Sequence, residues 1–193
     1  MPITHKIEKG EASILVWEIT ETLEGLLDLY GNINTSNYTS EKRKKEHLIS
    51  RLMVNKICKN GAIIYNEFGA PELDNAKHLS ISHSNELVTI IISDTKSGID
   101  IEKISDKALR IASKFVSEKN LIKLNKEKAT LIWCIKEAIY KWHQKGEVDF
   151  IKDIIIPELF AEEYGKVMAY FRGKKLNLNY LKINNHYLVY VCN

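Results

Sequence analysis

The hydrophobic and polar positions of this chain follow two different periods, one typical of strands and one typical of helices. Residues 13–19 alternate loosely and are rich in Ile, Val and Trp, which predicts a strand. Residues 40–59 carry apolar side chains at helical spacing, with Glu41 in the first turn, which predicts a helix. Short apolar segments typical of strands then follow at 62–66, 79–83, 86–93 and 98–102.

The C-terminal half places helices before strands. Ser105 and Ser117 are suitable caps for helices near 106–114 and 118–125, and helical spacing predicts a third helix at about 127–144 that ends at Gly146. The tail at 166–192 predicts three strands separated by two turns. This order of elements predicts an α+β fold, and we expect two similar lobes that meet near residue 95.

Composition narrows the class of protein without naming a partner. The chain has 193 residues, 45% of them hydrophobic and 27% charged, and its longest apolar run is far shorter than a membrane helix. Three widely spaced cysteines are typical of thiols in a reducing cytoplasm, and the N-terminus carries no apolar signal segment. The 28 basic and 25 acidic residues nearly cancel, so we expect neither a nucleic-acid-binding surface nor a membrane partner.

The segment 98–102 places two carboxylates on one side of a predicted strand. Because alternate residues of a strand face the same way, Asp100 and Glu102 project together while Ile99 and Ile101 point into the core. Two such carboxylates repel each other unless a cation or a proton relieves them, and Mg²⁺ suits the pair. A solvated edge strand is the structural alternative.

Two further segments combine charges with hydroxyl or aromatic groups. On the predicted helix at 127–144, Trp133, Lys136, Glu137, Tyr140 and Lys141 share one side, although Glu137 and Lys141 could also form a simple surface ion pair. The segment 80–84 has serines on both sides of His83, a group that can hold a phosphate oxygen.

Arginine is scarce in this chain, so each one is a candidate for bidentate recognition of a phosphate or carboxylate. Only four of the 28 basic residues are arginines. Arg43 and Arg51 are eight positions apart on the predicted helix at 40–59 and lie away from its apolar stripe. They could converge on one polyanionic ligand, or they could belong to a solvated basic face.

In this order and spacing, the four segments resemble the motifs of the 4'-phosphopantetheinyl transferase superfamily, in its larger single-chain form. Residues 98–102 match G-[IV]-D-[IV]-E, 133–141 match W-x-x-K-E-A-x-x-K, and 80–84 match S-x-S-H-S. Residues 42–51 closely resemble the K-R-x-x-E-H-L-x-x-R run of enterobactin-type members. Residues 69–71 match the G-x-P that precedes it, with Ala70 where members often have Lys. In 115–120, which resemble F-[FL]-S-x-x-E, Asn120 takes the usual acidic position.

The resemblance implies an enzyme that moves phosphopantetheine from coenzyme A to a serine of an acyl or peptidyl carrier protein, with Mg²⁺ as cofactor. It also implies two lobes in a pseudo-twofold arrangement, residues 1–95 and 96–193, with the active site between them, in a monomer. A coenzyme A or carrier-protein binding module without chemistry is the alternative. The implied roles are catalysis by Glu137 and Lys141, metal binding by Asp100, Glu102 and Glu137, and coenzyme A binding by Arg43, Arg51, Ser82, His83, Lys136 and Lys141.

Overall fold

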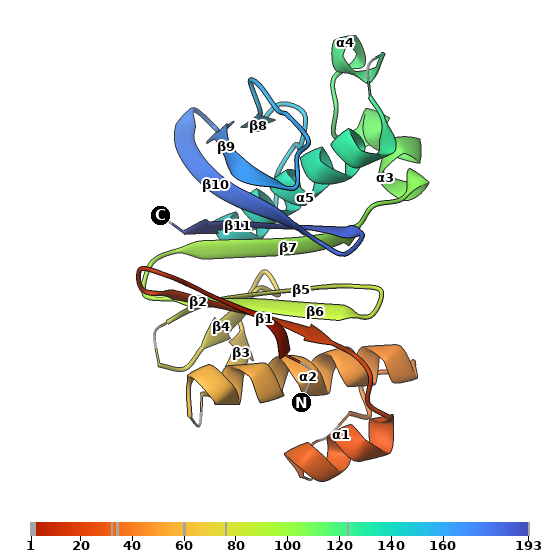
Figure 1. Cartoon of the computed structure of the whole chain (residues 1–193). Helices are drawn as coiled ribbons and strands as arrows, with labels where there is room; N and C mark the ends of the chain where they lie inside the picture. The colour runs from red at the N-terminus through yellow and green to blue at the C-terminus, as the bar shows by residue number, and fades with distance from the viewer. Residues whose placement is uncertain are drawn as a thin grey trace.

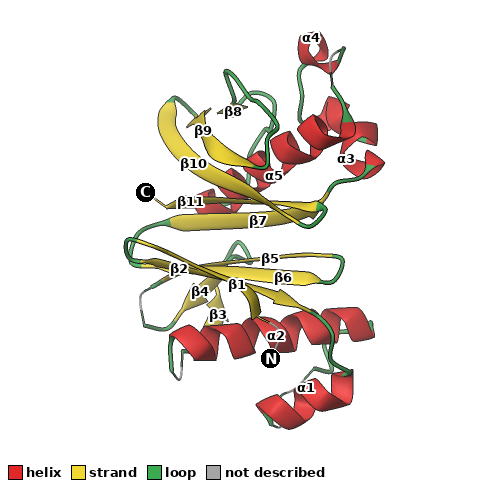
Figure 2. Cartoon of the chain, in the orientation of Figure 1, coloured by secondary structure: helices red, strands yellow, loops and turns green. Residues whose placement is uncertain are grey.

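Two antiparallel sheets form the centre of the molecule, and a long helix covers the outer face of each (Figures 1 and 2). The computed structural model describes residues 3–31, 33, 35–59, 61–75, 77–122 and 124–192. The N-terminal sheet has the strand order β1-β2-β6-β5 and contains β1 (Ile3–Lys9), β2 (Ala12–Glu18), β5 (His78–Ser84) and β6 (Leu87–Ser93).

The C-terminal sheet has the strand order β7-β11-β10-β9-β8, so that β7 forms one of its edges. A separate hairpin pairs two short strands that come before β5 in the chain. The C-terminal sheet consists of β7 (Ser97–Lys103), β8 (Ile154–Ile155), β9 (Tyr164–Phe171), β10 (Lys174–Ile183) and β11 (His186–Cys192). The hairpin consists of β3 (Ile63–Tyr65) and β4 (Pro71–Leu73).

The helices lie outside the two sheets, and two of them are long. In Figure 1 the helix α2 runs below the N-terminal sheet and α5 above the C-terminal sheet. None of the described helices is both long and apolar enough to cross a bilayer. The helices are α1 (Leu23–Tyr30), α2 (Glu41–Ile57), α3 (Asp106–Arg110), α4 (Glu118–Leu121) and α5 (Lys126–His143), with a 3₁₀ turn at Ala112–Lys114.

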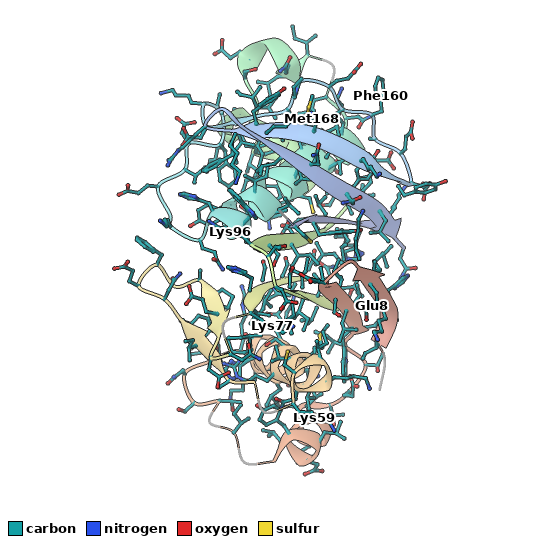
Figure 3. The ribbon with its side chains drawn as sticks, turned by 90° about the vertical axis from the view of Figure 1, so that its left-hand side faces the viewer. Glu8, Lys59, Lys77, Lys96, Phe160 and Met168 are labelled. Atoms are coloured by element: carbon teal, nitrogen blue, oxygen red, sulfur yellow. The ribbon has the colours of Figure 1, made fainter. Side chains whose placement is uncertain are left out.

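Three hydrophobic clusters fill the spaces between these four layers. One lies between α2 and the N-terminal sheet, and a second between α5 and the C-terminal sheet. The third joins the two sheets and includes Ile14, Ile91, Ile99 and Ile101. Seen from the side, Phe160 and Met168 lie at one end of this stack and Lys59 at the other (Figure 3).

The mixed α and β content predicted from the sequence is confirmed, and so are the helix at 40–59 and the strand at 98–102. Several expectations were wrong at their boundaries. The helix predicted at 106–114 divides into α3 and a 3₁₀ turn, α4 is shorter than predicted, and α5 ends at His143 because Gln144 adopts a left-handed conformation with φ 64°. The cysteines are free, as expected, and Cys192 is only half-buried.

Candidate active site

The strand β7 presents its two carboxylates toward α5, because its isoleucines occupy the core between the sheets. Ile99 and Ile101 are fully buried in that core, so Asp100 and Glu102 point to the opposite side. A Cβ atom at Gly98 would lie 2.2 Å from the carbonyl oxygen of Ala138 and 2.5 Å from the backbone nitrogen of Trp142. The missing side chain therefore lets α5 pack directly on β7, which brings Glu137 and Lys141 to the carboxylates.

Asp100 lies at the centre of this group and is only 2% exposed. Its Oδ1 accepts hydrogen bonds from the Ser82 hydroxyl at 2.7 Å and from the Lys141 ammonium at 2.6 Å. Its Oδ2 is also buried but has no hydrogen-bond partner among the described residues. One oxygen of this carboxylate is thus fixed from two sides, and the other is left without a hydrogen bond.

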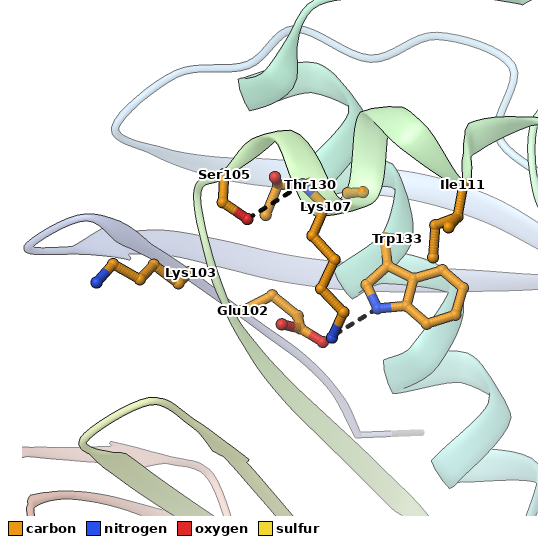
Figure 4. Close-up of a pocket in the computed structure, with 8 residues that line it drawn as sticks. Glu102, Lys103, Ser105, Lys107, Ile111, Thr130 and Trp133 are labelled. Atoms are coloured by element: carbon orange, nitrogen blue, oxygen red, sulfur yellow. Dashed lines mark hydrogen bonds between the residues drawn. The ribbon is translucent and has the colours of Figure 1, made fainter.

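Glu102 is oriented by an aromatic residue of α5. The indole Nε1 of Trp133 donates a hydrogen bond of 3.1 Å to Oε1 of Glu102. Both residues line a small cavity, and Lys107 lies along its wall as well (Figure 4). The Trp133 ring is held between Phe115 and Phe150, with ring centroids 5.1 and 5.6 Å away. Burial, and then the charge of Asp100, raises the pKa of the Glu102 carboxyl. Trp133 belongs to the matched motif, but its role as a hydrogen-bond donor was not predicted.

Glu137 has the most strongly perturbed carboxyl of this group. Burial is the largest cause, followed by repulsion from Asp100, and together they raise the pKa of Glu137 to about 7 in spite of the opposing charge of Lys141. A carboxyl that titrates near neutral pH can accept a proton from a substrate hydroxyl and release it again. Glu137 therefore has the protonation behaviour expected of a general base.

The chemistry of these side chains fits a hard divalent cation. Carboxylate oxygens are the ligands that Mg²⁺ prefers. The charge of Asp100 raises the pKa of both Glu102 and Glu137, and a positive ion would relieve this repulsion. The Oδ2 of Asp100, which has no hydrogen-bond partner among the described residues, is an oxygen of this kind. Within the described ranges, however, no three His, Cys, Asp or Glu side chains form a preformed metal site. The carboxylates share one electrostatic environment, in which the Lys141 ammonium compensates Asp100.

A second polar group joins α2 to the end of β5. Nη1 of Arg43 donates to Nε2 of His83 at 2.7 Å and to Oε2 of Glu46 at 2.9 Å. Burial is the main cause that lowers the pKa of His83, which favours the neutral ring that accepts this hydrogen bond. Glu46 is 4% exposed and was not among the predicted site residues, although its spacing of three from Arg43 could have indicated it. Arg43 and His83 are thus brought together as expected.

The structure does not bring Arg51 and Lys136 to these groups. The guanidinium of Arg51 donates to the backbone carbonyl of His47 at 3.3 Å, in its own helix. Lys136 is buried, and its ammonium donates to the carbonyl oxygens of Phe150 and Ile154. Burial lowers the pKa of Lys136 to about 8. Its placement indicates that it anchors the segment after α5, and gives no support to a phosphate contact.

Replacing Lys136 with Met is therefore expected to destabilise the protein without changing coenzyme A binding. The substitution leaves two backbone carbonyls without their donor, at a cost of about 1–3 kcal/mol each. The free energy of unfolding, measured with denaturant, should fall, and the dissociation constant for coenzyme A should stay within a factor of two or so of wild type. A large loss of coenzyme A affinity at unchanged stability would instead support a contact between Lys136 and a phosphate of coenzyme A.

A cavity of about 220 Å³ lies beside Lys141. Its walls come from the turn at 68–71, the start of β5 and the end of α5, and they include Phe68, Pro71 and Tyr140. Gly69 has φ +77°, a conformation that favours glycine, and forms the turn that brings Ala70 into this wall. The cavity thus lies between the G-x-P segment at 69–71 and the helix that carries Glu137 and Lys141.

Comparison with known proteins agrees with this geometry. The family model of the 4'-phosphopantetheinyl transferase superfamily matches residues 96–192, half of the chain. A curated relative, the 4'-phosphopantetheinyl transferase gsp of Aneurinibacillus migulanus, is 34% identical over 124 residues, which cover 56% of this chain and 52% of the relative. The chain thus aligns with about half the length of that relative. The matched region contains β7 with its carboxylates and the whole of α5. The chain belongs to the 4'-phosphopantetheinyl transferase superfamily.

Proposed function

We propose that this protein transfers the 4'-phosphopantetheine group of coenzyme A to a serine hydroxyl of an apo carrier protein and releases adenosine 3',5'-bisphosphate. The observation that carries the proposal is the pairing of Asp100 with Lys141 beside Glu137. Lys141 offers a cation for a pyrophosphate and Glu137 offers a base for a hydroxyl, within one small region. The curated relative carries the name of this activity, which supports the same conclusion.

In the proposed reaction, the serine oxygen of the carrier forms a bond to the phosphorus that bears the pantetheine arm. The bond from that phosphorus to the bridging oxygen breaks, and the bisphosphate leaves with the electron pair. Glu137 takes the serine proton, directly or through a water, because its pKa of about 7 lets it accept a proton near neutral pH. Lys141, one helical turn further along α5, stabilises the negative charge on the leaving bisphosphate.

Asp100, Glu102 and Glu137 are the residues that would hold Mg²⁺, which when bound neutralises the charge of the pyrophosphate. The ammonium of Lys141 compensates part of the negative charge of Asp100 through its contact with Oδ1. The hydrogen bond from Trp133 holds the Glu102 carboxylate in a fixed orientation. The protein's own contribution is therefore to position these groups and to keep them buried.

Arg43 and His83 are proposed to bind a phosphate of coenzyme A. Arg43 keeps most of its guanidinium available, since its side chain is 55% exposed although one nitrogen contacts His83 and Glu46. The cavity beside Lys141 would take a neighbouring part of the coenzyme. Ala70 replaces the lysine common in this wall, so binding depends more heavily on Arg43. Arg51 stays a weaker candidate because it contacts its own helix.

Replacing Arg43 with Ala is expected to raise the Michaelis constant for coenzyme A about tenfold or more, with a smaller change in turnover. The change removes a charged donor on the substrate side but no group of the reaction itself. Lys45 in the same helix pairs with Glu41 at 2.9 Å, so Lys45→Ala is a matched control that should leave the constant unchanged. Equal constants for wild type and Arg43→Ala would remove Arg43 from the coenzyme site.

The activity itself is tested by incubating the protein with coenzyme A, Mg²⁺ and an apo carrier protein, followed by mass spectrometry of the carrier. We expect a phosphopantetheine adduct on one serine and an equal amount of adenosine 3',5'-bisphosphate. Acyl and peptidyl carriers are tried in parallel. Binding of coenzyme A without an adduct on any carrier would favour the alternative of a binding module.

The finer features of the architecture belong to the same proposal. We propose that residues 1–95 and 96–193 are two lobes related by a pseudo-twofold axis, with the active site between them. In support, each half has one antiparallel sheet covered by one long helix, and the carboxylates of β7 lie next to the serines of β5. A cytoplasmic monomer is the expected form of the protein.

A further inference from the structure

Three serines of β5 connect the two sheets through their side chains. Ser80, Ser82 and Ser84 alternate along the strand and therefore face the same way. Each hydroxyl oxygen accepts a hydrogen bond from a backbone amide of β7, and we call this arrangement the serine ladder. The pairs are Ile99 to Ser80 at 3.1 Å, Ile101 to Ser82 at 3.2 Å and Lys103 to Ser84 at 3.0 Å.

Only one serine of the ladder also makes a short hydrogen bond to a carboxylate. Because each hydroxyl oxygen receives an amide proton, its own proton remains available for donation. Ser82 donates that proton to Oδ1 of Asp100 at 2.7 Å. Ser84 lies 3.5 Å from Oε2 of Glu102, which is a weak contact. Ser80 makes no hydrogen bond to a carboxylate in the described part of the chain.

From this difference we infer that Ser82 is a positioning residue for Asp100. Ser82 is 5% exposed, and its hydroxyl bridges the Ile101 amide and Oδ1 of Asp100, so it links the carboxylate to the backbone of its own strand. The Ser82 and Lys141 contacts both fall on Oδ1, which leaves the buried Oδ2 without a hydrogen bond and available to a divalent cation. Ser82 then acts through Asp100.

This inference rests on the proposed function, since it takes Asp100 as a metal ligand. It also changes the expected role of Ser82, which the family motif implied to be a coenzyme A contact. A hydroxyl that already binds an amide and a carboxylate has little capacity left for a phosphate oxygen. Groups that orient a ligand in this way typically change metal affinity by about 10–100-fold when they are removed.

The test compares Ser82→Ala with Ser80→Ala, because both substitutions remove one hydroxyl that accepts one β7 amide. Only Ser82→Ala also removes the hydrogen bond to Asp100. Mn²⁺ binding is measured from the electron paramagnetic resonance signal of the free ion, with coenzyme A present and no carrier, so that no turnover occurs. We expect the Mn²⁺ affinity of Ser82→Ala to fall about tenfold or more, and that of Ser80→Ala to equal wild type.

Each outcome has a separate meaning. An equal loss in both variants would overturn the inference, because the ladder would then act only as a structural connection. Wild-type affinity in Ser82→Ala would overturn it while leaving the metal site intact. Absence of Mn²⁺ binding by the wild type would overturn the metal assignment of the proposed function as well. If Ser82→Ala does not fold, Ser82→Cys takes its place, since a thiol fills the same space and is a weak donor.

Discussion

Replacing Glu137 with Gln is expected to reduce phosphopantetheine transfer by about 10³-fold or more, because the amide can neither accept the serine proton nor serve as an anionic metal ligand. The fold should remain, since Gln has nearly the same shape. Transfer is measured by mass spectrometry of the carrier. Glu127→Gln is the matched control, because Glu127 lies in the same helix and its carboxylate pairs with Lys182 at 3.4 Å, away from the candidate site. Transfer at a near-normal rate by Glu137→Gln would remove Glu137 from the reaction.

The same variant is also expected to change how stability depends on pH. In the metal-free protein, the folded pKa of Glu137 is about 7, above its usual value of 4.5. The folded state therefore binds this proton more tightly than the unfolded state. The resulting stability is complete below about pH 4.5 and is lost as the pH rises through 7. With a chelator present, we expect Glu137→Gln to melt at a higher temperature than wild type at pH 8, and with a smaller difference at pH 5.

A melting curve that shows the same pH dependence in wild type and Glu137→Gln would contradict this result. Titrating groups elsewhere, such as the buried His186, are unchanged between the two proteins and cancel in the comparison. Addition of Mg²⁺ should raise the melting temperature of wild type more than that of the variant, since a ligand stabilises the state that binds it.

Replacing Gly98 with Ala is expected to destabilise the fold and to impair transfer together. The new Cβ atom would meet backbone atoms of α5 at 2.2 and 2.5 Å, so the helix must move away from β7. Overpacking of this kind costs about 1–3 kcal/mol or more, and the movement also separates Glu137 and Lys141 from Asp100. Denaturant unfolding and the transfer assay measure the two effects.

Ser97→Ala provides the control for Gly98→Ala, since Ser97 is the preceding residue of the same strand. Its hydroxyl is buried and has no hydrogen-bond partner within the described ranges, so its removal should leave stability and transfer near wild type. Wild-type stability of Gly98→Ala would show that α5 does not pack on β7 in the way described.

The elements that carry the candidate site could be predicted from the sequence because their patterns are local. The apolar stripe of α2 and the alternation in β7 each require only neighbouring residues. The strand β1 was missed because most of its residues are exposed and polar, and only pairing with β2 makes it a strand. The helix α1 was missed as well, since its eight residues form too short a pattern to stand out.

The details of the site depend on contacts that are distant in sequence. Helical periodicity placed Lys136 on the same side of the helix as Glu137. In the structure, however, the ammonium of Lys136 donates a hydrogen bond to the carbonyl oxygen of Phe150, in the segment that follows the helix. Similarly, Arg43 contacts His83, which is 40 positions away in the sequence, whereas Arg51 contacts the backbone of its own helix. Ser82 could be identified as part of a motif, yet its carboxylate partner became visible only when β5 and β7 were placed side by side.

The serine ladder has a consequence for the behaviour of the protein in solution. Both β5 and β7 are edge strands, and exposed edges readily pair with strands of other molecules. The hydroxyls occupy three amides of β7 from within the molecule, so those donors are closed to intermolecular pairing although the two sheets never merge into one. The same short row of side chains thus covers one edge of β7 and contacts the carboxylate of Asp100.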